Sequence, residues 1–244
     1  MRKIILDLAV TLDGFIEGLN GEVDWCIMDP DMGFDDFLNS VDTILYGRKS
    51  YEKWGQYTPD KNASEAERDL WSLVHRKKKV VFSKSLKDVA PGVILIQDNI
   101  LDQINAMKNE KGENLWLYGG ASLITTFIEL DLIDEFRLSV HPVVLGAGKP
   151  LFTDVKERIN LELIENKRFS SGVVQLRYQK PKIRITSIKL GQPAIRALQG
   201  EGVKNLEQLS QYTEKDLLAI HGFGKKGIEI LKVAMAEQGV SFKV

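Results

Sequence analysis

An apolar run that ends in two adjacent glycines is the feature that most limits how this protein can fold. Residues 115–118 are Leu-Trp-Leu-Tyr, which predicts a buried strand, and apolar residues recur with helical spacing over 123–128. Between them, Gly119 and Gly120 carry no side chain, so a ligand can approach the backbone closely. Free N–H groups at the start of the helix favour an anion, which indicates a phosphate or pyrophosphate site. The alternative is a strand-to-helix turn in which glycine serves only the backbone geometry.

Two earlier strands end in a similar way. An apolar segment over 43–46 leads into Gly47-Arg48-Lys49-Ser50, and another over 80–82 leads into Ser83-Lys84-Ser85. Cations in the first turn of a helix oppose the helix dipole unless an anion lies nearby. The pattern therefore indicates phosphate binding, whereas the alternative is a basic helix start that is only solvated.

Together the three strand ends predict one ligand site. In an open α/β sheet, ligands bind beyond the carboxyl ends of the strands, so these ends are expected to converge. The two cationic ends would suit a 2′-phosphate and the two glycines a pyrophosphate, which predicts NADPH in preference to NADH. The fingerprint G-x-G-x-x-G is absent, so an ordinary Rossmann domain is not expected.

Composition points to an ordinary globular protein. The 244 residues are 43% hydrophobic with a formal net charge of −1, which argues against nucleic-acid binding over the whole surface. Cys26 is the only cysteine, so neither an internal disulfide nor a thiolate zinc cluster is expected, and no metal site is predicted. The first apolar run, residues 4–10, is interrupted by Asp7 and predicts a strand instead of a signal peptide. No stretch reaches membrane-spanning length, and a cytoplasmic protein is expected.

Several motifs resemble the dihydrofolate reductase superfamily. In sequence order they are D-G-F-I, G-R-K-S-Y-E, V-F-S-K-S, Y-G-G-A-S-L, and D-L-I-D-E-F-R-L-S-V-H-P-V-V-L-G-A-G. The last motif is most similar to the reductase half of the bifunctional riboflavin-biosynthesis deaminase/reductase. The resemblance covers residues 1–178 and implies an α/β fold with a mixed, mostly parallel sheet and flanking helices. Relatives of this type pair as dimers, so a homodimer is expected by analogy.

The same resemblance implies a set of cofactor contacts. On the adenosine 2′-phosphate side it places Gly47, Arg48, Lys49 and Ser50, with Ser83 and Lys84 nearby. At the pyrophosphate it places Gly119, Gly120, Ala121, Ser122 and Leu123. Beside the nicotinamide it places Ala9, Asp13, Gly14 and Phe15.

The implied reaction is hydride transfer from the nicotinamide to a C=N or C=O carbon of a small heterocycle. Dihydrofolate reductases use an acidic residue on the first helix, for which Asp31 and Asp35 are both candidates, and a proton from water is the alternative. The sequence has no clear arginine for a folate tail, since the corresponding region is Arg76-Lys77-Lys78-Lys79. The expected substrate therefore resembles that of 5-amino-6-(5-phosphoribosylamino)uracil reductase. A true dihydrofolate reductase, or a regulatory protein that binds a nucleotide without turnover, remains the alternative.

The end of this region predicts further strands. Alternating apolar residues over 136–140 and the run over 143–145 indicate late strands at an edge of the sheet. His141 precedes a proline in an extended segment, and a structural role is favoured over a catalytic one.

Beyond residue 178 the strand patterns stop. Residues 179–184 form a basic linker with a proline, and 185–244 predict a small all-α domain in which Thr213 caps a helix and Gly239 ends the last one. The segment I-H-G-F-G-K-K-G-I resembles helix-hairpin-helix domains and the C-terminal domain of the bacterial RNA polymerase alpha subunit. By that resemblance, a DNA phosphate would be contacted weakly and without sequence preference by Gly222, Gly224, Lys225 and Lys226. A protein-interaction or purely structural role is the alternative.

Overall fold

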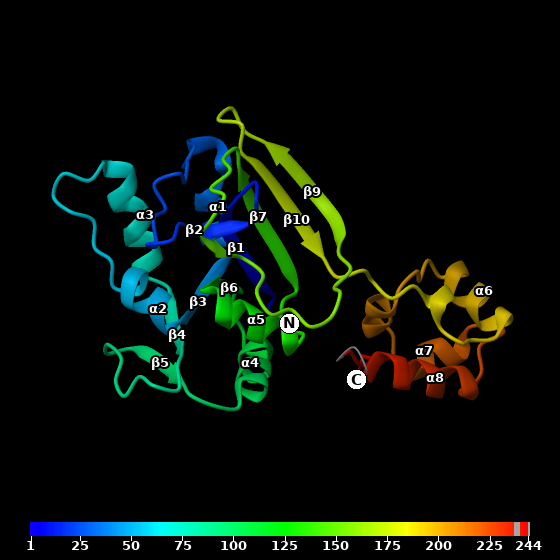
Figure 1. The fold of residues 1–244 in the computed structure, drawn as a ribbon. Helices are drawn as coiled ribbons and strands as arrows, with labels where there is room; N and C mark the ends of the chain where they lie inside the picture. The colour runs from blue at the N-terminus through cyan, green and yellow to red at the C-terminus, as the bar shows by residue number, and fades with distance from the viewer. Residues whose placement is uncertain (237–239, 244) are drawn as a thin grey trace. The chain divides into compact units, whose positions relative to one another are not determined.

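The protein folds as two compact units, Met1–Lys180 and Pro181–Val244 (Figure 1). A computed structural model describes residues 1–236 and 240–243. Within those ranges, no helix is both long enough and apolar enough to cross a membrane.

The first unit is built on one sheet, which has eight strands in the described part of the sequence. In spatial order they are β5 (Val93–Ile96), β4 (Lys78–Phe82), β3 (Val41–Gly47), β6 (Asn114–Gly119), β1 (Ile4–Thr11), β7 (Glu135–His141), β10 (Val174–Gln179) and β9 (Glu162–Arg168). The strands from β5 to β7 run parallel, and β10 and β9 pair antiparallel. A separate short ribbon joins β2 (Phe15–Glu17) to β8 (Lys149–Pro150). The predicted mixed, mostly parallel sheet is thus confirmed.

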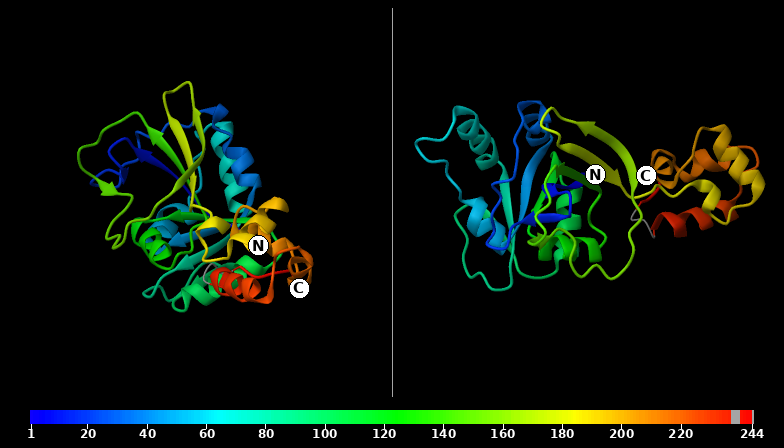
Figure 2. Two further views of the ribbon diagram at one scale, coloured as in Figure 1. Left: turned by 90° about the vertical axis from the view of Figure 1, so that its right-hand side faces the viewer. Right: turned by 45° about the horizontal axis from the view of Figure 1, so that its top comes forward.

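Helices cover both faces of this sheet (Figures 1 and 2). On one face, α1 (Phe34–Asn39) and α3 (Glu65–His75) bury Phe37 and Val74 against Trp116 and other side chains of the sheet. On the other face, α4 (Ile100–Asn109) and α5 (Ala121–Glu129) bury Ile104 and Phe127. Because successive side chains of a strand point to opposite faces, each central strand contributes to both cores. The short helices η1 (Pro30–Met32), α2 (Arg48–Ser50) and the π-helical turn η2 (Tyr51–Gly55) lie in the connections.

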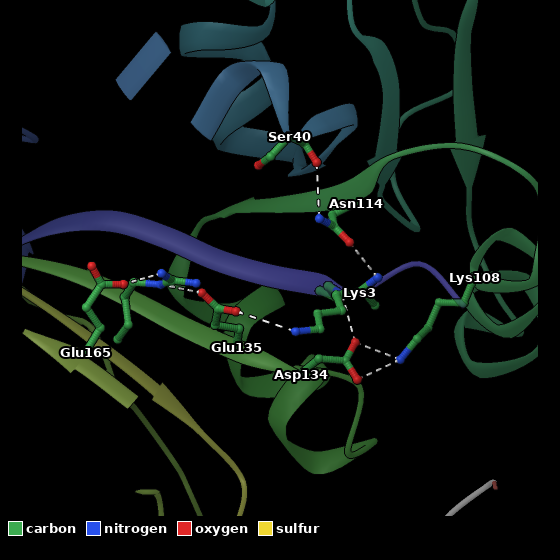
Figure 3. A network of polar contacts seen from close by, with 9 residues as sticks. Lys3, Ser40, Lys108, Asn114, Asp134, Glu135 and Glu165 are labelled. Carbon is green, nitrogen blue, oxygen red and sulfur yellow. Dashed lines mark hydrogen bonds and ion pairs between the residues drawn. The ribbon is translucent and has the colours of Figure 1, made fainter. Parts of the chain in front are cut away.

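Polar side chains hold the amino ends of the central strands together (Figure 3). The Asp134 carboxylate accepts hydrogen bonds from the Ile4 N–H and from the Lys108 ammonium, each at 2.7 Å. The Asn114 side chain accepts from the Lys3 N–H at 3.0 Å and donates to a carbonyl oxygen after α1 at 3.1 Å. These contacts fix β1, β6 and β7 at one end of the sheet, so the loops at the opposite, carboxyl ends are the ones that can carry a ligand site.

The prediction of an edge at residues 136–145 was wrong. β7 is an interior strand, because β1 pairs with it on one side and β10 on the other. Residues 143–145 form no strand; the Val143 carbonyl accepts from the Leu12 N–H at 2.9 Å, and the Leu145 N–H donates to Asp13 at 3.3 Å. Among the described residues, the strands at the two edges of the sheet are β5 and β9. No sequence pattern indicates β9, because all of its residues are exposed and so show no alternation.

In its described part, the second unit is built of helices, with one isolated β-bridge between Arg184 and Asn205. It contains η3 (Ile185–Ser187), α6 (Gln192–Gly200), η4 (Leu206–Gln211), α7 (Glu214–Ala219) and α8 (Lys225–Ala236). The predicted Thr213 cap is confirmed, because its side chain and that of Asp216 exchange hydrogen bonds with each other's backbone N–H groups. Leu198, Leu209 and Leu231 are fully buried and form the core. Gly239, the predicted end of the last helix, lies outside the described residues.

The connection between the units is shorter than the six residues predicted over 179–184. Gln179 still belongs to β10, whereas the Ile183 carbonyl already accepts from Leu206 at 2.9 Å and Arg184 pairs with Asn205. The ends of the predicted linker therefore form backbone contacts within the two units, and only residues 180–182 remain between these contacts.

Candidate functional site

The carboxyl ends of β4, β3 and β6 lie side by side, as the sequence predicted. Gly47 pairs with Phe82 on one side of β3, and Tyr46 pairs with Gly119 on the other. A Cβ added to Gly47 would lie 3.4 Å from both the Gly119 carbonyl oxygen and the Gly120 nitrogen. The two glycine turns are therefore in direct backbone contact, and Ser83 follows immediately after the neighbouring strand.

Gly119 and Gly120 leave an open cradle in front of α5. Gly119 has a φ of 110°, in the region that favours glycine, and the peptide bond to Gly120 is cis. A Cβ at Gly120 would lie 3.2 Å from the Ser50 Oγ, so even a methyl group would occupy the space between the turn and that hydroxyl. We refer to this space, bounded by Gly47, Ser50 and Gly119–Gly120, as the glycine cradle.

The N–H groups that face the glycine cradle differ in part from those predicted. The Leu123 N–H donates to the Gly120 carbonyl at 2.9 Å, and the Leu123 side chain is buried in the core. The Leu123 N–H is therefore already used within the first turn of α5, and its side chain is part of the core. Ala121 and Ser122 begin the helix, where N–H groups have no intrahelical partner, so the predicted anion contact at these two residues stays a prediction.

Cationic side chains follow the strands that end at the glycine cradle. Arg48 and Lys49 are exposed, and the Arg48 guanidinium donates to both carboxylate oxygens of Glu52 at 3.1 Å. This i,i+4 pair offsets part of the unfavourable positive charge at the start of α2. Lys84 is also exposed, whereas the Ser83 Oγ accepts from the Leu86 N–H at 3.1 Å.

Lys149 completes the cluster, and sequence reasoning missed it. A Cβ added to Gly120 would lie 3.8 Å from the Lys149 Nζ. The Lys149 ammonium also forms an ion pair with the Glu17 carboxylate at 2.9 Å. No local signal marks Lys149, because only the pairing of β2 with β8 brings it to the glycine cradle.

The Asp13 side chain connects the D-G-F-I motif with the last motif, which contains Gly146. Its carboxylate accepts from the Thr11 hydroxyl at 2.6 Å and from the Gly146 N–H at 2.8 Å. These hydrogen bonds hold the pKa of Asp13 below its ordinary value. The carboxylate therefore joins the loop after β1 to the loop after β7, and Gly14 and Phe15 follow it into β2. Ala9 lies two residues before the end of β1 and pairs with Ser139.

The segment over residues 24–29 covers the carboxyl ends of β6, β1 and β7. The Trp25 ring meets the His141 ring edge-on at 5.3 Å, and His141 pairs with Thr11 at the end of β1. At the other end, Cys26 lies close enough to raise the pKa of Tyr118, although burial is the larger cause. The His141 ring also approaches the Ser139 carbonyl at 2.9 Å, which agrees with the structural role predicted for it.

Three buried polar atoms at this covered end have no hydrogen-bond partner among the described residues: the Trp25 Nε1, one Asp29 carboxylate oxygen and the Tyr46 hydroxyl. Tyr46 is completely buried, and its ring packs 4.9 Å from that of Tyr118. Buried polar groups are normally paired, so these atoms mark a place where a polar ligand would be complementary. Sequence reasoning missed all three residues, because burial of a polar atom is not visible in a pattern.

The two predicted acids are both exposed. Asp31 is exposed on η1, and Asp35 is exposed in the first turn of α1, where a carboxylate suits the helix dipole. Asp29 precedes them by a few residues and is the acid of this segment with a buried, unpartnered oxygen.

A buried ion pair joins the middle of β1 to β7. Asp7 on β1 is 5% exposed and accepts from the Arg137 guanidinium at 2.7 Å, and Arg137 lies 4.6 Å from the Phe37 ring. Burial raises the pKa of Asp7 to about 6, because the desolvation of the carboxylate outweighs the attraction of Arg137.

The raised pKa of Asp7 predicts a pH-dependent stability. An acid whose pKa rises from 3.8 to about 6 on folding binds its proton more tightly in the folded state, so its contribution to stability falls as the pH rises through that interval. Between pH 5 and 7.5 we expect the wild-type protein to lose roughly 1 kcal/mol relative to Asp7→Asn. Thermal unfolding of both proteins at the two pH values measures the difference. Equal pH dependence of the two would show that Asp7 does not titrate in this range.

In the helical unit, the predicted phosphate-binding residues lie in one exposed turn. Gly222, Gly224, Lys225 and Lys226 are all exposed, while Phe223 between them is buried in the core. Gly222 has a φ of 88°, which only glycine adopts readily, and the two lysines open α8.

Known proteins resemble both units. Residues 2–175 match the family described as the RibD C-terminal domain, and residues 175–237 match the C-terminal domain of the bacterial RNA polymerase alpha subunit. The uncharacterised protein YyaP of Bacillus subtilis is 66% identical over 177 residues, which are 72% of this protein and 94% of that one.

Solved structures agree with this assignment. The structure of a putative riboflavin biosynthesis protein from Shewanella sp. PV-4 has 27% identity and a TM-score of 0.60, and covers 75% of this protein and all of that one. Dihydrofolate reductase from Enterococcus faecalis, complexed with NADP(H), has 13% identity and a TM-score of 0.52 over 73% of this protein and 96% of that one, which shows a common fold. The sheet unit of this protein thus belongs to the RibD C-terminal domain family, a family of reductase type with a dihydrofolate-reductase-like fold.

Proposed function

We propose that this protein is an NADPH-dependent reductase that transfers hydride to a small heterocycle of the riboflavin-pathway type. The observation that carries the proposal is the glycine cradle, where two glycine turns from adjacent strands meet in front of the start of α5. Membership of the RibD C-terminal domain family supports the same conclusion.

The residues around the glycine cradle fit a dinucleotide phosphate. A side chain at Gly120 would fill the space beside Ser50, so the open position favours close approach of a pyrophosphate to the backbone. Arg48, Lys49 and Lys84 are exposed cations on adjoining strand ends, which favours a cofactor with an additional phosphate. When bound, NADPH supplies the hydride, and the protein aligns it with the substrate and excludes water.

The covered end of the sheet suits the substrate. The Trp25 Nε1 is a donor, an Asp29 carboxylate oxygen is an acceptor, and the Tyr46 hydroxyl can act as either, so together they would satisfy a ring that carries both N–H and C=O groups. This complementarity favours a pyrimidine-like heterocycle. We propose Asp29, in place of Asp31 or Asp35, as the carboxylate that orients the substrate.

Calorimetric titration of the full-length protein with NADPH and, separately, with NADH tests the proposal. Binding of NADPH at least about tenfold tighter than that of NADH would support it, because the extra phosphate adds charge-assisted hydrogen bonds. Loss of nicotinamide absorbance would then identify substrates among aminopyrimidines and dihydrofolate. If neither cofactor binds, the protein is not a nicotinamide-dependent reductase.

A second function is supported for the helical unit, namely weak binding to DNA phosphates. Its match to the C-terminal domain of the RNA polymerase alpha subunit and the exposed Gly222–Lys226 turn favour this function. Replacing Lys225 and Lys226 by alanine is expected to weaken binding to a labelled duplex of about 20 base pairs about tenfold and to lower the salt slope by about 2, because two phosphate contacts are lost. Fluorescence anisotropy at several salt concentrations measures both quantities.

Lys189→Ala/Lys204→Ala is the matched control for that experiment, since it removes the same charge from other positions of the same unit. If both double variants change the salt slope equally, the contact is a general charge effect and not one made by the glycine turn. Reductase activity is expected to be the same in both.

We also propose the homodimer expected from the family. The exposed edge strand β9, with Leu163 46% and Ile164 40% exposed, is a surface that a second copy could cover. Light scattering of the full-length protein would give the mass, and a monomer at all concentrations would refute the proposal.

A further inference from the structure

A cavity of about 340 Å³ lies on the α3 face of the sheet, away from the glycine cradle. It is lined by the end of η2, the end of α3, the starts of β4 and β5, and the turn before β5, with Tyr51, His75, Lys77 and Lys79 as its titratable side chains. Its volume lies within the range of small-molecule sites. Lys79 precedes Phe82 by three residues, so the cavity is about 10 Å along β4 from the strand end that contacts Gly47.

The lining of this cavity carries positive charge without a compensating carboxylate. No Asp or Glu is among its lining residues, and within the described ranges His75, Lys77 and Lys79 form no ion pair within 4.0 Å. Lys77 and Lys79 are both half-buried. Holding a cation away from water without a partner is unfavourable, and burial accordingly lowers the pKa of Lys79.

The polar side chains of the cavity are held in place by hydrogen bonds, and Lys79 still has N–H groups without a partner in the ranges that the structure describes. The Lys79 ammonium donates one hydrogen bond to the Gly55 carbonyl at 2.7 Å, so two of its three N–H groups remain for a ligand. The His75 Nε2 donates to the Tyr57 carbonyl at 2.8 Å, and the His75 ring packs 6.1 Å from Trp71. Two amines with spare donors in a cavity that has no acid favour an oxyanion.

We propose that this cavity binds the phosphate or carboxylate group of a small molecule, with Lys77 and Lys79 as its charge partners. The site is separate from the glycine cradle and does not depend on the proposed reductase activity. Phosphate and carboxylate share the recognised chemistry, namely anionic oxygens that accept charge-assisted hydrogen bonds.

The test is calorimetric titration of the full-length protein with inorganic phosphate and, in a separate arm, with succinate, at low ionic strength. Lys79→Met and Lys77→Met each remove one charge and keep most of the apolar stem. Each is expected to weaken binding about tenfold, because a charge-assisted hydrogen bond is lost. The arm with the larger effect identifies the preferred anion.

Two control variants make the result specific. Lys78→Met removes the same charge from the residue between them, which is exposed and does not line the cavity. Lys49→Met removes a charge beside the glycine cradle, where phosphate could also bind. Neither control is expected to change the affinity of the cavity.

Three results would overturn the proposal: no heat with either anion, loss of binding only in Lys49→Met, or equal loss in Lys78→Met. The second of these would place the anion at the glycine cradle and leave the reductase proposal intact. Circular dichroism establishes that each variant is folded. Because Lys77 is half-buried just before the start of β4, Lys77→Met provides the decisive comparison if Lys79→Met unfolds.

Discussion

Replacing Arg48 and Lys49 together by alanine is expected to raise the dissociation constant for NADPH about 100-fold and to leave that for NADH nearly unchanged. Both side chains are exposed beside the glycine cradle, where a 2′-phosphate would approach. Since only NADPH carries that phosphate, the loss of two cations removes the preference between the cofactors. Calorimetric titration of the variant with each cofactor gives both constants.

The Arg48–Glu52 pair provides a check on this prediction. Arg48 is partly neutralised by Glu52 at 3.1 Å, so Lys49→Ala alone is expected to cause the larger part of the loss. Arg76→Ala/Lys78→Ala is the matched control, because it removes two exposed charges on the same unit away from the carboxyl ends of the strands. Equal weakening of NADH and NADPH in the Arg48/Lys49 variant would contradict a 2′-phosphate site there.

Arg137→Met is expected to lower the free energy of unfolding of the sheet unit by about 3–5 kcal/mol, because it leaves the Asp7 carboxylate buried without a partner. Arg137 and Asp7 are 8% and 5% exposed, so water cannot replace the lost contact readily. A loss of that size lowers the melting temperature of a unit of this length by about 10 °C. All four tryptophans lie in the sheet unit, so their fluorescence reports its unfolding.

The double variant Asp7→Asn/Arg137→Met separates lost charge pairing from lost packing. Removing the carboxylate charge is expected to restore much of the stability, because a neutral amide costs far less to bury than a carboxylate. If the double variant is as unstable as Arg137→Met, the stacking of Arg137 on the Phe37 ring, at 4.6 Å, is the more important interaction.

Much of the fold follows from local patterns in the sequence. The runs over 43–46, 80–82 and 115–118 all became interior strands, because short apolar segments ended by glycine or polar residues have few other stable arrangements. The helix capped by Thr213 and the apolar face of α8 were also predictable from local patterns, since each depends on residues three or four positions apart. The exposed strand β9 escaped prediction, because it shows no alternating pattern of apolar and polar residues. The strand β5 also escaped prediction, although its sequence Val-Ile-Leu-Ile is a short apolar run like the others.

The convergence of the glycine-containing strand ends was predictable for the same reason. Parallel strands place their carboxyl ends at one edge of a sheet, so the order of the strands needed only to make them neighbours. The sequence by itself therefore determined the fold class, the family and the position of the glycine cradle. Only the tertiary structure decided which further groups surround it.

Those further groups come from residues far apart in the sequence. Lys149 reaches Gly120 only because β8 pairs with β2, and Arg137 meets Asp7 only because β7 lies next to β1. The unpartnered Tyr46 hydroxyl and Asp29 oxygen became visible only once burial was known. Register between distant strands and exclusion of water depend on the packing of the whole unit, which no short stretch of sequence encodes.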